Sequence, residues 1–205
     1  CSSLSSVAFP ESLEVIGSKA FYDCDSLRSV IIPENVTVIG TNVFKNCTNL
    51  ASVSVSEGNP SYCDISGALF NKDATKLLCY PQGRYGAFEI PDTITIIDHE
   101  TFHYCTHLTG ITIPDSVTVI AENAFTDCNG LTSVAIPGSV TVIGHSAFSR
   151  CNNLASLTIG DGVKSIAGNA FSNCNSLESL NIPDSVTEIG DGAFSNCNSL
   201  TSITI

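Results

Sequence analysis

A spacing of 23 residues recurs along almost the whole chain and constrains its fold more than any other feature. Eight of the ten cysteines follow this spacing. They are Cys1, Cys24, Cys47, Cys105, Cys128, Cys151, Cys174 and Cys197. Only the step from Cys47 to Cys105 is longer, at 58 residues, and a Phe stands three residues before each of these cysteines except the first. A fixed period of this length is the signature of a solenoid, in which each unit packs against its neighbours.

One complete unit runs from Leu108 to Gly130 and reads LTGITIPDSVTVIAENAFTDCNG. Its isoleucines, Ile111 and Ile113, are two positions apart, which predicts a short strand with one buried face. Pro114 ends this strand, because proline cannot donate a hydrogen bond to a ladder. The β-branched run at 117–120 predicts a second strand.

The last third of the unit predicts a short helical turn. Ala124, Phe125 and Cys128 are spaced as on one face of an α-helix or a 3₁₀-helix. No unit can bury its apolar side alone, so stacked copies must share one core. The sequence therefore predicts an α/β repeat that is rich in β-structure, with short helical or 3₁₀ turns.

The repeated pattern L-x-S-[IV]-x-I-P-x-x-V-T-x-I-G-x-x-A-F-x-x-C resembles the BspA-type (Treponema-type) leucine-rich repeat. Residues 186–190, with Phe194 and Cys197, form one of seven matching copies. The resemblance covers nearly the whole chain and implies a right-handed leucine-rich-repeat solenoid of 23-residue units. It also implies a cell-surface or extracellular protein of bacteria or some protozoan parasites, used for adhesion and protein binding.

The stretch at 56–91 interrupts the period, because it uses 35 residues where a unit uses 23. Ala68–Phe70 and Lys76–Tyr80 flank a polar turn at 71–75, which predicts a β-hairpin. The stretch resembles an elongated repeat found in the same family. We expect residues 1–205 to form a single solenoid that includes this hairpin. Both ends fall inside a repeat, so we also expect a fragment of a longer chain.

The cysteines that share one repeat phase are expected to form a buried column of free thiols. Neighbouring coils lie about 4.8 Å apart, but side chains in one phase all point the same way, which disfavours disulfides. Cys63 and Cys79 lie outside this phase and are the best candidates if any bridge exists. No C-x-x-C spacing occurs, so a structural zinc site is not expected.

His99, Glu100 and His103 match the H-E-x-x-H signature of zinc proteases. That chemistry needs two histidines one helical turn apart, with the glutamate as general base. The repeat offers another interpretation, because Thr101 and Phe102 fill its A-F positions and the three polar residues fall at variable positions. We favour this second interpretation and expect no catalytic residue, no metal and no cofactor.

The formal net charge of −12 argues against nucleic acid and anionic membrane surfaces as partners. No apolar run approaches the roughly 18 residues that a membrane span needs, so membrane insertion is not expected. An unidentified protein is the expected partner.

Repeat proteins bind with extended faces, and the outward positions of the first strands form the candidate concave face. Its columns are small, rich in hydroxyl groups and nearly uncharged. The residues are Ser29, Ile31, Ser52, Ser54, Thr112, Ser133, Ala135, Ser156, Thr158, Ser179 and Asn181, with Ser6, Ala8, Gly110, Ser202 and Thr204 at the same positions. Tight interfaces usually carry aromatic or Arg anchors, so these residues either follow the consensus or make weak, multivalent contacts.

The second strands hold a candidate association stripe at the third position of V-T-x-I. Its members are Val15, Val38, Ile96, Val119 and Val142, followed by Ser165 and Glu188. Either the neighbouring turn partly covers these side chains, or they point outward and form an apolar patch suited to a partner or to weak self-association. Two functions remain open: a protein-binding adhesion module, and a structural spacer or self-associating rod without a specific ligand.

Overall fold

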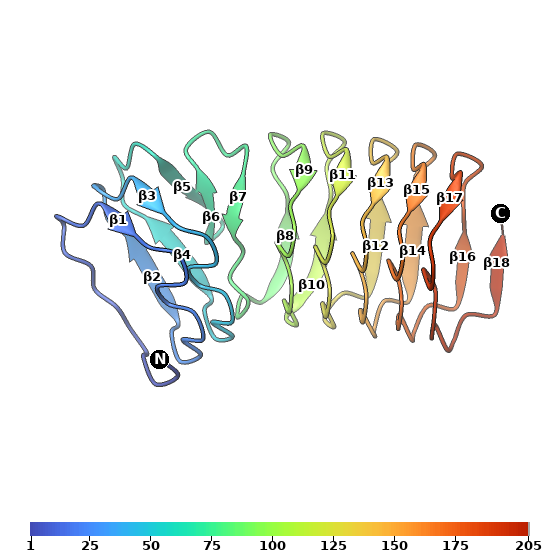
Figure 1. The fold of residues 1–205 in the computed structure, drawn as a ribbon, viewed down its shortest axis with the longest axis horizontal. Coiled ribbons are helices and arrows are strands. Elements are labelled where there is room, and N and C mark those ends of the chain that lie inside the picture. Colours follow the sequence, from blue (N-terminus) through green and yellow to red (C-terminus); the bar gives the residue numbers. More distant parts are fainter. Residues whose placement is uncertain (205) are drawn as a thin grey trace. The chain divides into compact units, whose positions relative to one another are not determined.

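The structure is a computed structural model that describes residues 1–204. The chain divides into two compact units, residues 1–84 (unit 1) and 85–205 (unit 2). Each unit is a stack of coils made of strands and turns (Figure 1). Within residues 1–204, no helix has the length and apolarity needed to cross a membrane.

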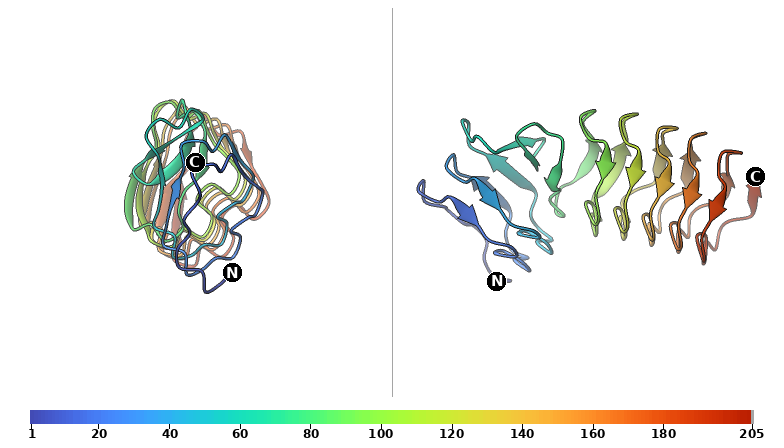
Figure 2. Two further views of the ribbon diagram at one scale, coloured as in Figure 1. Left: turned by 90° about the vertical axis from the view of Figure 1, so that its left-hand side faces the viewer. Right: turned by 45° about the horizontal axis from the view of Figure 1, so that its top comes forward.

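Each regular coil of unit 2 contains a longer first strand and a two-residue second strand. The first strands are β8 (Gly86–Glu89), β10 (Leu108–Thr112), β12 (Ser133–Ile136), β14 (Ser156–Ile159), β16 (Ser179–Asn181) and β18 (Ser202–Thr204). The second strands are β9 (Ile96–Ile97), β11 (Val119–Ile120), β13 (Val142–Ile143), β15 (Ser165–Ile166) and β17 (Glu188–Ile189). The second strands form one parallel sheet in the order β9-β11-β13-β15-β17 (Figure 2, right).

In the second strands of unit 2, each residue pairs with the residue one repeat earlier and the residue one repeat later. Val119 of β11 pairs with Ile96 on one side and with Val142 on the other. Equivalent residues therefore lie side by side in columns along the stack. In β12 the apolar residues of the alternating sequence are buried, whereas Ser133 and Ala135 are exposed. The predicted period-2 pattern of the first strand is thus confirmed in this coil.

A column of phenylalanine rings fills the core beside the turns of unit 2. The ring of Phe125 stacks on Phe102 and on Phe148 with centroid distances of 4.8 Å on both sides. Phe171 continues the column at 5.3 Å from Phe148, and Phe194 follows at 5.5 Å. These spacings lie within the range of favourable offset stacking. The recurring Phe therefore joins each coil to the next.

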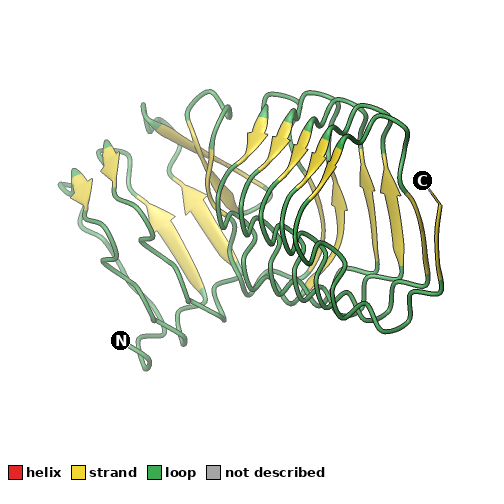
Figure 3. Ribbon diagram, turned by 45° about the vertical axis from the view of Figure 1, so that its right-hand side comes forward, coloured by secondary structure: helices red, strands yellow, loops and turns green. Residues whose placement is uncertain are grey.

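The predicted helical turn was wrong, because the segment that holds the recurring A-F pair forms stacked turns (Figure 3). Asn123 and Asp127 bracket Phe125 and have φ angles of 55° and 62°. Left-handed residues at these two positions cannot continue a right-handed helix. The N–H of Phe125 donates instead to the carbonyl of Ala147 in the next coil, at 2.7 Å. The described fold is a β-solenoid rather than an α/β repeat.

Unit 1 contains regular coils followed by an antiparallel sheet. Its strands are β1 (Val15–Ile16), β2 (Ser29–Ile32), β3 (Val38–Ile39), β4 (Ser52–Val55), β5 (Tyr62–Ile65), β6 (Ala68–Asn71) and β7 (Leu77–Cys79). Strands β1 and β3 pair in parallel, as do β2 and β4. The predicted hairpin is confirmed by the antiparallel pairing of β6 with β7. Strand β5, which also pairs with β6, was not predicted.

Asn59 stabilises the backbone where the regular coils of unit 1 lead into this antiparallel sheet. Its side chain is fully buried, and its amide nitrogen donates to the carbonyls of Pro33 and Val36 at 2.8 and 3.0 Å. Its side-chain oxygen accepts the N–H groups of Ser61 and Tyr62, both at 2.9 Å. One buried amide therefore satisfies four backbone groups where the chain leaves the repeat path.

Candidate binding surfaces

The first-strand face, as we call the outward positions of the first strands, carries the residues predicted for a concave binding face. Its exposed members are Ser29, Ile31, Thr112, Ser133, Ala135, Ser156, Thr158, Ser179 and Asn181. Ser52 and Ser54 on β4 are only half-exposed. The antiparallel sheet is the cause, because the N–H of Val53 donates to the carbonyl of Gly67 at 2.8 Å. The open face predicted at β4 is therefore partly covered.

A shallow hollow of about 280 Å³ lies on the first-strand face of unit 2. Its lining includes Ser156, Ser179 and Asn181, together with Ser202 and Thr204. These side chains offer hydroxyl and amide groups but no aromatic ring and no charge. Small-molecule sites are usually deeper and lined by apolar and aromatic side chains. The hollow is better suited to surface contact than to enclosing a substrate.

The association stripe lies on the second strands, and most of its side chains reach solvent. In unit 1, Val15 and Val38 pair across β1 and β3 and are 54% and 50% exposed. In unit 2, Ile96 is 53% exposed and Val142 is 36% exposed. Val119 lies between them and is half-buried. Each unit therefore carries aligned apolar side chains that its own core does not cover.

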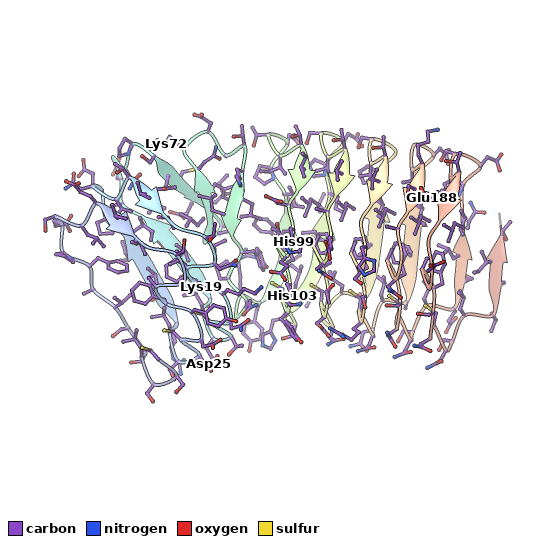
Figure 4. All side chains as sticks on the ribbon, viewed as in Figure 1. Lys19, Asp25, Lys72, His99, His103 and Glu188 are labelled. Atoms are coloured by element: carbon purple, nitrogen blue, oxygen red, sulfur yellow. The ribbon has the colours of Figure 1, made fainter. Side chains whose placement is uncertain are left out.

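The zinc-protease motif falls in a turn between β9 and β10, and Figure 4 places His99 and His103 on the same coil. Glu100 has a φ angle of 54°, so the segment is not the helix that the motif chemistry needs. The Nε2 atom of His99 and the Oε1 atom of Glu100 are 3.8 Å apart. Among residues 1–204, no three His, Cys, Asp or Glu side chains are grouped to hold a metal ion.

The ten cysteines are free thiols, and seven of the eight that share the repeat phase are buried. The predicted column of buried thiols is confirmed, with the exception of the exposed Cys1. Cys63 and Cys79, the best candidates if any bridge existed, are both free thiols in the structure. Their strands, β5 and β7, lie on opposite sides of β6, and two strand spacings of about 4.8 Å exceed the reach of a disulfide.

Burial raises the pKa of the thiols in this column. The pKa of Cys47 is raised to about 11, and those of Cys128 and Cys151 lie well above the ordinary value of 9.0. Desolvation is the main cause, because a thiolate would lose its hydration inside the core. These thiols are therefore poor nucleophiles near neutral pH.

A ladder of asparagine side chains runs along the turns of unit 2 and was not predicted from the sequence. Asn152 donates to the side-chain oxygen of Asn129 at 2.9 Å. Asn175 donates in turn to Asn152 at 2.9 Å, and Asn198 donates to Asn175 at 3.1 Å. The Asn that follows Cys at each of these 23-residue steps was the available signal.

An ion pair between coils was also missed. Arg150 donates to both carboxylate oxygens of the buried Asp127, at 2.9 and 2.8 Å. Asp127 raises the pKa of the Arg150 guanidinium through these bonds and its charge. This arrangement neutralises a buried carboxylate and links two neighbouring coils.

Comparison with known proteins agrees with this geometry. The BspA type leucine rich repeat region (6 copies) matches residues 1–77 and 75–201. The comparison with curated proteins returned no match. Among solved structures, the T. pallidum leucine-rich repeat protein is 32% identical, with a TM-score of 0.54, and the match covers 92% of this chain and 72% of that one.

Two further solved structures come from other bacteria. A leucine-rich repeat protein from Eubacterium ventriosum is 27% identical, with a TM-score of 0.59 and 94% of this chain covered. A leucine rich cell surface protein from Faecalibacterium prausnitzii is 29% identical, with a TM-score of 0.58 and 95% covered. The chain spans 64% and 52% of their respective lengths. The coil architecture, the column of recurring residues and the family match together establish that this chain belongs to the BspA-type leucine-rich-repeat family.

Proposed function

We propose that this chain is a non-enzymatic protein-binding module of a cell-surface or secreted protein that adheres to host or microbial proteins. The exposed apolar side chains of the association stripe carry the proposal. Val15 and Val38 are in register in unit 1, and Ile96 and Val142 flank Val119 in unit 2. Aligned apolar side chains in water are stabilised when a partner covers them.

Family membership supports this function. Solenoid repeats present extended faces, which are suited to contact with other macromolecules. One relative is described as a leucine rich cell surface protein, which supports a surface location for this chain. A non-enzymatic role is supported by the turn geometry at Glu100 and by the raised pKa values of the buried thiols.

Binding to matrix and plasma proteins tests the proposal. The purified chain is immobilised and exposed to a panel of these proteins, and saturable binding to at least one is expected. A variant in which Val15, Val38, Ile96 and Val142 are all changed to Ser should bind about tenfold more weakly or less. Serine is compatible with this column, because Ser165 occupies it on β15. A chain that binds no panel member contradicts the proposal.

The first-strand face is the second proposed binding surface, and one variant separates it from the stripe. Ser179→Arg would fill the hollow lined by Ser156 and Asn181 without changing the second strands. Loss of binding in Ser179→Arg, with binding retained in the stripe variant, would assign the site to the first-strand face.

Self-association is the alternative function, because a second copy could also cover the stripe. Light scattering at increasing protein concentration distinguishes the two functions. A mass that grows with concentration in the native chain but not in the stripe variant favours a self-associating rod. A constant mass together with a saturable partner favours the binding module.

A further inference from the structure

The acidic charge of the chain is concentrated in unit 2. Residues 85–205 contain 12 acidic and two basic residues, a formal net charge of −10. Residues 1–84 contain eight acidic and six basic residues, a formal net charge of −2. The two units share one repeat but differ strongly in charge, so the repeat consensus does not account for the difference.

Most of these carboxylates lie close in sequence to the column of residues that holds the association stripe in unit 2. Eight exposed acidic residues lie within four positions along the chain of residues 96, 119, 142, 165 and 188, which form the stripe column of unit 2; the last two of these, Ser165 and Glu188, are not apolar. The eight acidic residues are Asp92, Asp98, Asp115, Glu122, Asp161, Asp184, Glu188 and Asp191. Lys164 is the one basic residue in the same segments, 92–99, 115–122, 138–145, 161–168 and 184–191. Four of the eight acidic residues flank Ile96 and Val119, four flank or occupy the column at 165 and 188, and the segment 138–145 around Val142 holds none. We call this surface, with its apolar side chains and neighbouring carboxylates, the second-strand face of unit 2.

The strand geometry brings apolar and acidic groups onto this one face. Ile96 and Asp98 are two residues apart and both exposed, and the buried Ile97 lies between them. Side chains two residues apart on an extended segment point to the same side. At the other end of the sheet, Glu188 occupies the stripe position on β17 (Figure 4). Its carboxylate accepts a hydrogen bond from Ser165 at 3.1 Å.

A second copy of the chain fits this face poorly. Two such faces in contact would bring eight carboxylates toward eight others, with one lysine on each side to offset them. Like charges brought together at an interface cost several kcal/mol. A cationic partner has the opposite effect, because the negative field speeds its approach and its Lys or Arg side chains can pair with the carboxylates.

We propose that the second-strand face of unit 2 binds a cationic polypeptide segment in which apolar side chains alternate with Lys or Arg. The apolar side chains cover Ile96, Val119 and Val142, while the basic ones meet the carboxylates around them. The methylene stems of Lys and Arg add apolar contact beside the stripe. This inference rests on the proposed protein-binding function and names the chemistry of the partner.

Fluorescently labelled peptides test this inference on the full chain. The probe is a short synthetic peptide of alternating Leu and Lys, and the comparison peptide alternates Ser and Lys at equal length and charge. We expect the Leu–Lys peptide to bind about tenfold more tightly. We also expect its affinity to fall about tenfold between roughly 50 and 500 mM NaCl, because the carboxylates contribute through screened charge.

Two matched double variants locate the site. Ile96→Ser with Val142→Ser should bring the two peptides to within about twofold of each other. Val15→Ser with Val38→Ser makes the same kind of change at exposed positions of the less acidic unit 1 and should leave the preference for the Leu–Lys peptide intact. Circular dichroism checks that both variants keep the fold.

Several results would overturn the inference. Equal affinity for the two peptides in the native chain would mean attraction by charge alone. An equal loss in both double variants would remove the assignment to unit 2. Concentration-dependent mass that disappears only in Ile96→Ser with Val142→Ser would make a second copy the occupant. If a panel protein binds this variant as well as the native chain, the inference fails while the protein-binding function stands.

Discussion

The thiol of Cys151 lies 3.1 Å from the carbonyl oxygen of Phe125, 26 residues earlier in the chain. That carbonyl also accepts the backbone N–H of Cys128 in its own coil, at 3.3 Å. The same thiol-to-carbonyl contact recurs in four other coils. The pairs are Cys47 with Phe21, Cys128 with Phe102, Cys174 with Phe148, and Cys197 with Phe171. The recurring Cys is thus a small apolar core residue that also donates a weak hydrogen bond to the preceding coil.

Replacing Cys151 by Ala should lower the free energy of unfolding by about 1–2 kcal/mol, because both the sulfur volume and a weak hydrogen bond are lost. Urea unfolding followed by circular dichroism measures the change. Cys1→Ala is the control, since Cys1 is exposed and should have little effect. Equal stability of Cys151→Ala and the native chain would mean that the thiol contributes neither packing nor bonding.

Alkaline pH should destabilise the fold through the buried thiols. The pKa of Cys47 is raised from 9.0 to about 11, so the unfolded thiol loses its proton at a lower pH than the folded one. This contribution to stability is fully present below pH 9 and is lost as the pH rises through about 11. Urea unfolding at pH 7, 9 and 10.5 should show a falling midpoint. Cys47→Ala should reduce the slope, and an unchanged slope would contradict the role assigned to this thiol.

Truncation of Phe125 should be severe. Its ring stacks on two neighbours and is fully buried, so Phe125→Ala leaves a cavity and should cost about 3–5 kcal/mol. Tyr85→Ala is the matched control, because Tyr85 is 73% exposed, and it should change stability by only about 0.5 kcal/mol. Thermal unfolding of both variants checks the prediction, and similar losses in the two would contradict a shared stacked core.

Purified chain should hold zinc well below one equivalent, because the motif at His99 and His103 lies in a turn rather than on a helix. Elemental analysis after dialysis against zinc makes the measurement. His99→Ala with His103→Ala should give the same zinc content as the native chain. Stoichiometric zinc that is lost in this double variant would show that the turn does bind metal.

Local pattern was sufficient to predict the strands and their buried faces. In β12, Val134 and Ile136 point inward while Ser133 and Ala135 point outward, as the alternation indicates. The hairpin at β6 and β7 was also predicted, because a polar turn separates two apolar runs. Strand β5 was missed because residues 62–65 carry no clear alternation, and its pairing depends on β6, which comes later in the chain.

The candidate surfaces could be predicted only in part. The repeat phase singled out Val38 and Ile96 as positions that either point outward or are covered by the neighbouring turn, and both are about half exposed. The partial covering of Ser52 and Ser54 depends on the antiparallel sheet packed beside β4, which the repeat pattern does not describe. The pair of Arg150 with Asp127 was also missed, because its partners are 23 residues apart and neither is part of the consensus.

The 23-residue coil, the inward columns and the position of the interruption could all be predicted from the sequence, because they depend on side-chain periodicity within each unit. The conformation of the A-F segment depends instead on contacts between neighbouring coils. The spacing of Ala124, Phe125 and Cys128 is compatible with a helix, yet the N–H of Phe125 bonds to the next coil at 2.7 Å. A helical turn would keep its hydrogen bonds within one unit, whereas in the stack the N–H groups of one coil can bond to carbonyl groups of the next. Hydrogen bonds between coils are available only when the coils already lie side by side.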